Sequence, residues 1–406
     1  MFTNITKINI PKILIKILTD LQKIGSKPIL VGGCVRDSFL DKKIKDYDIE
    51  IFALNDIEII QKTLEKYAKI KLVGKSFGVL TCKIDELDFD FSLPRVEQKI
   101  GKYHQDFSIT TNPNLSFKEA AIRRDFTINA IGYDYFKNEF LDPFCGIEDL
   151  KNGVLKHIND NTFIEDSLRV YRAVQFASRF ELKLDESTKI LCKNIINSGE
   201  LKYLPRERIF EELKKLFIKS KKPSIGLELL REFEIFDFIN SFEAIDNLAN
   251  IIFEEEFDNL RKLSLFFSIL CKNMKKDIKI EFLKNLSNDK KFIEIVLNLS
   301  SHSLTKSDKE LKKLSLLLNL EDMIIIEKAF KNENIIEIEN LTQSLDIYNK
   351  PLKRLIFGRD LINLGFKEGL EFKEILDYAL VLQIENCLNK EEIINLITKN
   401  YKIKSF

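Results

Sequence analysis

The sequence predicts an α+β protein in which a head of mixed strands and helices is followed by an all-helical remainder. In the first 150 residues, short apolar runs, several with a period of two, are separated by turn residues, which is typical of strands. From about Asn161 onward, glycine and proline become sparse and apolar residues recur at helical spacing, as at Ile209 and Leu213. The hydrophobic content of 45% is enough for cores in more than one domain.

Charge and cysteine usage restrict the classes of partner and location. The 64 Lys and Arg residues nearly balance the 63 Asp and Glu residues, so any RNA contact must come from local clusters of cations. The six cysteines are scattered without a C-x-x-C pair, which favours reduced thiols. Lysines interrupt the first 20 residues, and no apolar run approaches the ~20 residues that span a bilayer. We therefore expect a soluble cytoplasmic protein with no membrane partner and no evident obligate protein partner.

A Gly-Gly turn joins the first strand to a helix. Residues 28–31 form an apolar run that predicts a buried strand, and a helix follows from about Val35. Gly32 and Gly33 between them allow a tight turn and the close approach of a ligand. Because the exposed N–H groups of a helix start attract anions, this segment is typical of a phosphate-binding turn.

Three aspartates are predicted to share one face of the sheet. Asp46 and Asp48 open an apolar run and, being two apart on a strand, point to the same side. Strands predicted at residues 71–73 and 79–84 surround a turn at residues 74–78, and the alternating strand that follows offers Asp90 as the third carboxylate. Carboxylate oxygens suit a pair of Mg²⁺ ions ~3.5–4 Å apart, as in nucleotidyl transfer. The alternative is that the first two aspartates are solvated residues of a lysine-rich turn.

Two adjacent arginines, Arg123 and Arg124, form a second candidate contact. They cannot both face the same side of a helix or strand, so we expect one to reach a triphosphate and the other to pair locally, for example with Asp125. A surface charge pair is the alternative.

A third motif, residues 165–172, is predicted to lie on one helix. Asp166, Arg169 and Arg172 then span an arc of about 120°, and apolar residues fill the opposite side. Cytosine and adenine present an amino group beside a ring-nitrogen acceptor, whereas uracil and guanine present a carbonyl beside a ring N–H. A carboxylate beside a guanidinium therefore favours C and A without a template. An ordinary i,i+3 ion pair remains the alternative.

A fourth motif, residues 205–213, combines Glu207, Arg208 and Glu212 with helical apolar spacing. We expect a buried charge network that braces the nucleotide-reading helix, and a plain amphipathic helix explains the pattern nearly as well.

These motifs, in this order, resemble the class II tRNA nucleotidyltransferase and poly(A) polymerase family of the polymerase-β-like superfamily. The resemblance covers residues 28–217. Residues 30–48 resemble its G-G-x-V-R-D…D-x-D motif, 90–95 its third-carboxylate strand, 123–130 its R-R-D-F-T-x-N-A motif, 142–150 its D-P-F-G-G-x-x-D-L motif, 165–172 its E-D-x-x-R motif and 207–212 its E-R-I-x-x-E motif.

The resemblance implies a catalytic head with a polymerase-β-like palm sheet (residues 1–152), a helical neck that recognises the nucleotide (153–222), and a helical body and tail that bind tRNA (223–406). It assigns catalysis and Mg²⁺ binding to Asp46, Asp48 and Asp90. It assigns nucleotide-phosphate contacts to Gly33, Arg36 and Arg124, and base reading to Asp166 and Arg169 with Arg172 close by. The partners implied are the 3′ acceptor end of tRNA, ATP and CTP.

The segment of residues 90–107 is closer to CCA-adding members, so we expect template-independent addition of C, C and A. An enzyme restricted to A (a poly(A) polymerase or an A-adding enzyme) or to the two C residues is an alternative, and a non-catalytic RNA-binding protein is another. Some relatives carry an HD phosphohydrolase domain, which is not expected because none of the three histidines is followed by aspartate. Cys145 and Gln175 depart from the family pattern, in which glycine and arginine are common, and we assign no nucleotide contact to Gln175.

Overall fold

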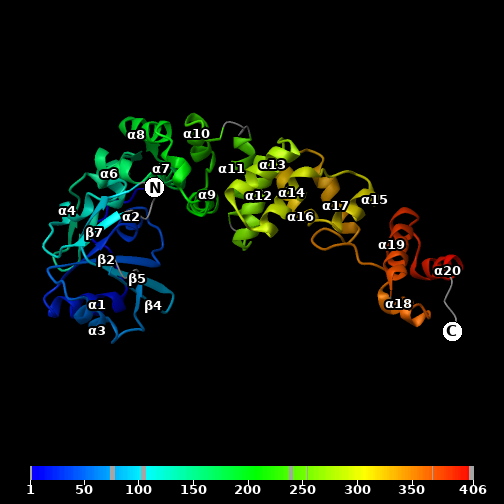
Figure 1. Ribbon diagram of the computed structural model, residues 1–406, viewed down its shortest axis with the longest axis horizontal. Coiled ribbons are helices and arrows are strands. Elements are labelled where there is room, and N and C mark those ends of the chain that lie inside the picture. Colours follow the sequence, from blue (N-terminus) through cyan, green and yellow to red (C-terminus); the bar gives the residue numbers. More distant parts are fainter. Residues whose placement is uncertain are drawn as a thin grey trace. The chain divides into compact units, whose positions relative to one another are not determined.

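The computed structural model describes residues 2–73, 78–101, 107–236, 241–253, 255–367 and 369–401. The chain divides into two compact units, Met1–Phe238 and Ile239–Phe406, which are described separately. The turn predicted at residues 74–78 falls largely on residues 74–77, which lie outside the described residues. Figure 1 labels the elements of both units along the chain.

A seven-stranded sheet organises the first unit, in the order β3-β4-β5-β2-β1-β8-β9. Its strands are β1 (Lys27–Val31), β2 (Asp46–Phe52), β3 (Lys71–Val73), β4 (Val79–Ile84), β5 (Leu87–Ser92), β8 (Gly132–Asp134) and β9 (Glu139–Leu141). The neighbours β2 and β5 run parallel, and the other pairs are antiparallel. The strands predicted from the apolar runs and from the period of two are confirmed.

Helices cover this sheet and lead into it. They are α1 (Lys12–Lys23), α2 (Gly33–Phe39) and α3 (Ile57–Leu64). Helix α1 buries Leu14, Ile17, Leu18 and Leu21, whose spacing places them on one side of the helix. Helix α2 begins directly after the Gly-Gly turn and packs against β1 and β2, so the turn is fixed from both sides.

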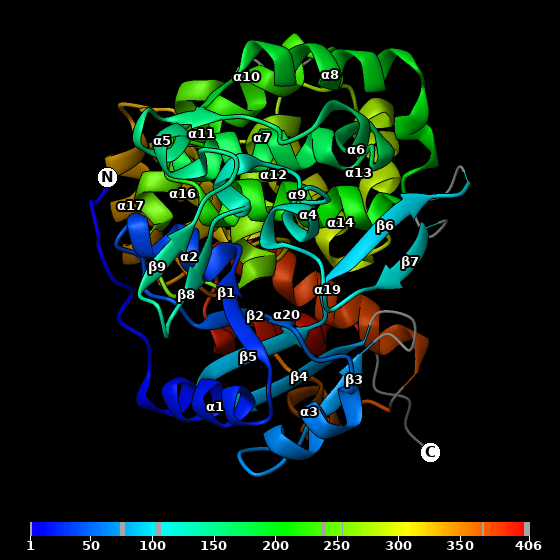
Figure 2. The same cartoon turned by 90° about the vertical axis from the view of Figure 1, so that its left-hand side faces the viewer.

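A separate antiparallel hairpin of β6 (Arg95–Lys99) and β7 (Phe107–Thr111) stands beside the sheet, as Figure 2 shows. The chain then passes through α4 (Phe117–Ala121) and a short 3₁₀ helix, η1 (Thr127–Asn129). The capping box of Ser116 and Glu119 closes the start of α4. The segment between α4 and η1 carries the paired arginines and is neither helix nor strand.

Helices build the rest of the first unit around α7 (Arg169–Phe180). They are α5 (Gly146–Lys151), α6 (Asp160–Glu165), α8 (Glu186–Asn197), η2 (Glu200–Tyr203), α9 (Arg206–Lys219) and α10 (Ser224–Glu232), with a small parallel pair of β10 (Val154–Leu155) and β11 (Lys183–Leu184). Helix α7 buries Val170, Ala173, Val174 and Ala177 and packs against α9 and α10. The boundaries at residues 152 and 222 remain predictions, and α10, which begins after the second of them, belongs to this packing.

The described residues of the second unit form helices and loops without a strand, as predicted, whereas the short strands β10 and β11 depart from the all-helical neck predicted at residues 153–222. Its helices are α11 (Phe242–Ile252), α12 (Asn259–Cys271), α13 (Lys276–Leu286), α14 (Lys290–Ser301), α15 (Asp308–Ser315), α16 (Leu320–Ala329), α17 (Ile335–Ser344), α18 (Gly358–Asn363), α19 (Leu370–Glu385) and α20 (Lys390–Asn400). Helix α12 is buried over most of its length and packs against α11, α14 and α16. Across the described part of the chain, no helix is long and apolar enough to cross a membrane.

Candidate active site

The Gly32–Gly33 turn connects β1 to α2. Gly32 has φ +69°, a backbone conformation that favours glycine. A side chain at Gly32 would place its Cβ 3.1 Å from Arg124 Nη1 and 3.5 Å from Asp48 Oδ2. The backbone conformation of the turn therefore favours glycine, and a side chain here would also displace the Arg124 guanidinium by a few tenths of an ångström.

The three predicted carboxylates, Asp46, Asp48 and Asp90, lie on one face of the sheet, which we call the carboxylate face. In the parallel pairing of β2 with β5, Asp48 is opposite Asp90, and Asp46 is opposite Asp88. Residues in register on neighbouring strands share a face, as do residues two apart on one strand. All three side chains are exposed. Partial loss of water and the neighbouring carboxylates raise the pKa of Asp48 and of Asp90.

The carboxylate face fits a divalent cation without forming a closed set of ligands. Among the residues that the structure describes, no three His, Cys, Asp or Glu side chains are gathered closely enough to hold a metal ion. The donors that the face offers are carboxylate oxygens, which hard cations such as Mg²⁺ prefer. A cation bound here would also relieve the repulsion that raises the pKa of Asp48 and Asp90.

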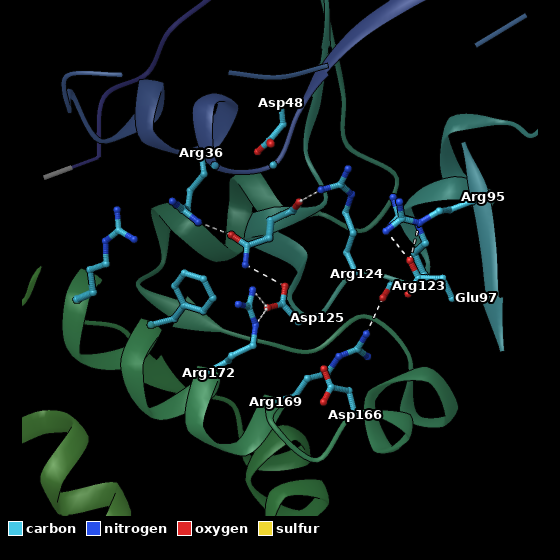
Figure 3. A pocket seen from close by; sticks show the side chains of 15 residues that line it. Arg36, Asp48, Arg95, Glu97, Arg123, Arg124, Asp125, Asp166, Arg169 and Arg172 are labelled. Atoms are coloured by element: carbon cyan, nitrogen blue, oxygen red, sulfur yellow. Dashed lines mark hydrogen bonds and ion pairs between the residues drawn. The ribbon is translucent and has the colours of Figure 1, made fainter. Parts of the chain in front are cut away.

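A cavity of about 430 Å³ begins at Asp48 and the glycine turn and is lined mainly by arginines. We call these seven arginines the arginine wall: Arg36, Arg95, Arg123, Arg124, Arg169, Arg172 and Arg179. Four carboxylates, those of Asp48, Glu97, Asp125 and Asp166, also line the cavity and leave an excess of three positive charges. Figure 3 shows these side chains around the cavity. An excess of arginine in a recess of this size suits a polyphosphate.

The adjacent arginines differ in how firmly they are held. Arg123 donates to Glu50 at 2.9 Å and to Glu97 at 3.3 Å. Arg124 makes only longer contacts, 3.5 Å from Nη1 to the Asn129 carbonyl and 3.7 Å from Nη2 to Glu50 Oε2. Arg123 therefore pairs with carboxylates of the protein, but these are Glu50 and Glu97, which are distant in sequence, and not a local partner such as Asp125. Both guanidinium groups reach the same glutamate because the chain there is a turn.

Asp125 instead connects two arginines of the wall, Arg172 directly and Arg36 through Asn129. It accepts hydrogen bonds from Arg172 Nε at 2.8 Å and from Asn129 Nδ2 at 2.9 Å, and Asn129 Oδ1 accepts one from Arg36. Burial opposes its ionisation, but Arg172 and the hydrogen bond from Asn129 lower the pKa of Asp125 to about 2. Arg36 and Arg172 are thus fixed in one network (Figure 3).

The prediction that Asp166 lies on the same helix as Arg169 and Arg172 is wrong. Helix α6 ends at Glu165 and α7 begins at Arg169, so Asp166 lies in the junction between them. Its Oδ1 accepts a hydrogen bond from the Leu168 N–H at 3.1 Å, a local bond by which aspartate competes with helix formation. Asp166 and Arg169 nevertheless both line the cavity, as predicted for a pair that reads one base (Figure 3).

Arg169 is held by backbone carbonyls. Its Nη1 donates to Thr162 O and its Nη2 to Arg123 O, both at 2.6 Å. Burial lowers the pKa of Arg169, although Asp125 and Asp166 oppose this effect. The guanidinium orientation is therefore set by the protein.

The predicted brace at residues 207–212 is confirmed for Glu212. Glu212 is buried, 2.8 Å from Lys215 Nζ and 3.9 Å from Arg172 Nη1. Glu207 is exposed and pairs with Arg206 at 3.3 Å, so it takes no part in the network. Gln175 is buried, and its Nε2 has no hydrogen-bond partner in the described structure.

Glu50, which contacts two arginines of the cavity, and Arg179, which lines it, are among the residues that were not identified from the sequence. Glu50 continues the spacing of Asp46 and Asp48 along β2, and a charged residue inside an apolar run was the available signal. Arg179 lies three residues after Phe176 and seven after Arg172 on α7, so helical spacing places it on the same side. It lines the cavity and lies 3.7 Å from Asp37.

Two family descriptions match this chain. Residues 29–156 match the poly A polymerase head domain, and residues 181–245 match the probable RNA and SrmB-binding site of polymerase A. The first match contains the carboxylate face, the glycine turn and Arg123 and Arg124. The second begins just after α7.

Named relatives resemble either most of this chain or about half of it. A CCA-adding enzyme of Buchnera aphidicola subsp. Schizaphis graminum is 30% identical over 404 residues, which cover 93% of this chain and 94% of that protein. A multifunctional CCA protein of Pseudoalteromonas atlantica is 37% identical over 207 residues, 50% of this chain, and the match spans about half (48%) of that relative. A crystal structure of a tRNA nucleotidyltransferase with a primer tRNA and an incoming ATP analog is 26% identical, with a TM-score of 0.62, over 81% of this chain and 98% of that one.

Proposed function

The chain belongs to the class II tRNA nucleotidyltransferase family, and we propose that it adds C, C and A to the 3′ end of tRNA from CTP and ATP. The observation that carries this proposal is the cavity whose lining contains Asp48 of the carboxylate face, the arginine wall, and Asp166 with Arg169. Its volume and charge suit one nucleoside triphosphate, with the phosphates beside Asp48 and the base beside Arg169. Relatives named for CCA addition support the choice of reaction.

In this proposal the terminal 3′-hydroxyl of the tRNA attacks the α-phosphate, and pyrophosphate leaves. Asp46, Asp48 and Asp90 would hold Mg²⁺, which when bound activates the hydroxyl and offsets the triphosphate charge. Gly33 at the start of α2 and the guanidinium groups of Arg36 and Arg124 bind the phosphates.

Base selection is assigned to Asp166 and Arg169. The carboxylate accepts from the amino group of cytosine or adenine, and the guanidinium donates to the neighbouring ring nitrogen. Because two carbonyls already orient Arg169, little side-chain entropy is lost when the base binds. Arg172, fixed by Asp125, lies beside the nucleotide.

The helical second unit is assigned to the tRNA acceptor arm, which would be held by its backbone and shape rather than by its sequence. We also propose a cytoplasmic location, where tRNA and nucleoside triphosphates are at hand and where the free cysteines stay reduced.

The test is an incorporation assay with purified protein, labelled nucleotides and tRNAs ending in zero, one, two or three of the terminal nucleotides. We expect C, C and A to be added in order with Mg²⁺ present, no addition to the complete end, and loss of incorporation with retained tRNA binding in Asp46→Asn. Failure of the wild-type protein to add any nucleotide would overturn the proposal.

Single-nucleotide incubations separate the alternatives within the family. Incorporation from CTP alone on a tRNA ending at the discriminator base excludes an enzyme restricted to A. Incorporation from ATP on a CC-ended tRNA excludes an enzyme restricted to C, and a stop after one A excludes a poly(A) polymerase. A non-catalytic RNA-binding protein would show no activity for Asp46→Asn to remove.

A further inference from the structure

Glu50 is a fully buried carboxylate in the middle of the sheet. Its strand, β2, lies between β5 and β1, where Glu50 is opposite Ser92 and Ile29, and its side chain has no exposed surface. A carboxylate in such a place destabilises the fold by several kcal/mol unless cations and hydrogen bonds compensate. The residues that compensate it are therefore the first clue to its role.

The compensating groups are the two arginines of the candidate site. Glu50 Oε1 accepts a hydrogen bond from Arg123 Nη2 at 2.9 Å, and Oε2 lies 3.7 Å from Arg124 Nη2. Within the described residues, Glu50 Oε2 and the Nε atoms of both arginines have no hydrogen-bond partner. Glu50 itself does not line the cavity, whereas both arginines do (Figure 3). Any influence of Glu50 on a ligand must pass through them.

The two arginines depend on Glu50 to different degrees. Arg123 has a second carboxylate partner in Glu97, at 3.3 Å. Arg124 has an ion pair with Glu50 at 3.7 Å, and the hydrogen bond that it makes within the described residues is a long one, 3.5 Å to the Asn129 carbonyl. Without Glu50, Arg123 keeps the carboxylate of Glu97 at its guanidinium, whereas Arg124 keeps one long hydrogen bond and the weaker attraction of Asp48 and Asp125. The orientation of Arg124 is thus the property most exposed to a change at position 50.

We propose that Glu50 is a positioning residue that directs Arg124 toward the triphosphate of the incoming nucleotide. The inference rests on the proposed function and deepens it, since it adds to the site a residue that touches no substrate. The long contacts of Arg124 are part of the arrangement: the guanidinium is oriented by Glu50 but keeps donors for phosphate oxygens.

Two physical effects of Glu50 on nucleotide binding have opposite signs. As a negative charge beside two phosphate-facing arginines, it weakens the attraction of the cavity for an anion. As a support for Arg124, it strengthens binding by holding the guanidinium in place. Removal of the charge in Glu50→Gln therefore strengthens nucleotide binding if only charge matters and weakens it if position matters.

The experiment compares wild type, Glu50→Gln and a matched control, Asp322→Asn. Asp322 is also a buried carboxylate that accepts from an arginine, Arg261, at 2.7 Å, but in the second unit. We measure KM for CTP and for ATP, kcat, the melting temperature, and the Kd of each nucleotide without tRNA. In Glu50→Gln we expect KM and Kd for both nucleotides to rise by about tenfold. This is the effect of weakening one hydrogen bond from Arg124 to a phosphate oxygen of the nucleotide. In Asp322→Asn we expect a lower melting temperature with both constants unchanged.

A double mutant identifies the route of the effect. If Glu50 acts through Arg124, Glu50→Gln adds little to the KM increase of Arg124→Lys, whereas independent effects would add in free energy. Additive effects would overturn the inference, as would a KM in Glu50→Gln that is unchanged or lower. A lower melting temperature with normal KM and Kd would make Glu50 purely structural.

Two outcomes need a separate interpretation: Glu50→Gln that does not fold, and wild type that is inactive. If Glu50→Gln does not fold, Glu50→Asp retains the charge and shortens the side chain by one methylene. Position then predicts a rise in KM and Kd, and charge alone predicts no change. If wild type neither binds nor incorporates nucleotides, the proposed function fails rather than the role of Glu50.

Discussion

The carboxylate face reaches the cavity of the arginine wall through Asp48, but the charges of the face and of the wall are balanced in opposite ways. In the described part of the chain, Asp46, Asp48 and Asp90 form no ion pair, and burial together with the neighbouring carboxylates raises the pKa of Asp48 and Asp90. Most arginines of the wall are held at 2.6 to 3.3 Å by protein acceptors. The face is thus built to receive a cation, and the wall is oriented before an anion arrives. Substitutions in the carboxylate face and in the arginine wall test this difference.

The largest effect is expected from Asp48→Asn. With one oxygen ligand neutralised, incorporation should fall by ~10³-fold, about 4 kcal/mol of transition-state stabilisation. Binding of CTP in the absence of Mg²⁺ should be unchanged or tighter, because a negative charge near Arg124 is gone. Rapid-quench incorporation and equilibrium binding in EDTA measure the two quantities. An incorporation rate within tenfold of wild type would remove Asp48 from the catalytic set.

The next effect concerns the least engaged arginine of the adjacent pair. Arg124→Ala should raise KM for CTP and ATP by about 30- to 100-fold, the value of one or two hydrogen bonds to a charged phosphate. Because phosphates carry no base identity, the ratio of the two KM values should stay constant. Steady-state kinetics with each nucleotide measures this, and a change confined to one nucleotide would assign Arg124 to base reading instead.

Asp125 holds Arg172 in place, so substitution of Asp125 should change how the free energy of unfolding depends on pH. Its folded-state pKa of about 2 lies below the ordinary value of 3.8, so its contribution is present above pH 4 and is lost as the pH falls through 2. That contribution is about 2 kcal/mol. Between pH 4 and pH 2, the free energy of unfolding of the wild type should therefore fall by about 2 kcal/mol more than that of Asp125→Asn. Urea unfolding at a series of pH values measures it, and parallel curves would contradict the assignment.

The carboxylate face could be predicted from the sequence because strand geometry is local. Asp46 and Asp48 share a face by their spacing alone, and Asp90 required only that its strand be a neighbour of theirs. The glycine turn and the helix after it could be predicted for the same reason. The fold class followed from the change in apolar spacing near residue 161.

The arginine wall could be predicted only in part, because its partners are distant in sequence. Glu50 lies 73 residues before Arg123, and Arg172 lies 47 after Asp125. No periodicity pairs such residues, so Asp125 was assigned to the wrong arginine. Asp166 was placed on the helix of Arg169 and Arg172 because three-residue spacing indicates one. Its side chain instead accepts from the Leu168 N–H, and that helix begins only at Arg169.

The smallest effect is expected at Cys145, the residue before α5, where glycine is common in the family pattern. Cys145 has φ +59° and precedes Gly146, whose Cβ position would lie 2.2 Å from the Thr127 carbonyl of η1. A left-handed conformation costs a residue with a Cβ roughly 1–2 kcal/mol, partly offset by the greater unfolded-state entropy of glycine. Cys145→Gly should therefore stabilise the protein by about 0.5–1 kcal/mol, with incorporation unchanged.

Two variants separate backbone strain from thiol chemistry at this position. Cys145→Ala keeps the Cβ and should give no gain, and Cys387→Gly, at φ +55° in the second unit, should give a similar one. Chemical unfolding measures each variant. A gain in Cys145→Ala equal to that in Cys145→Gly would attribute the effect to the thiol. The backbone at Cys145 would then carry no strain, and Cys145 would no longer differ in strain from Gly32, where glycine occupies a left-handed conformation.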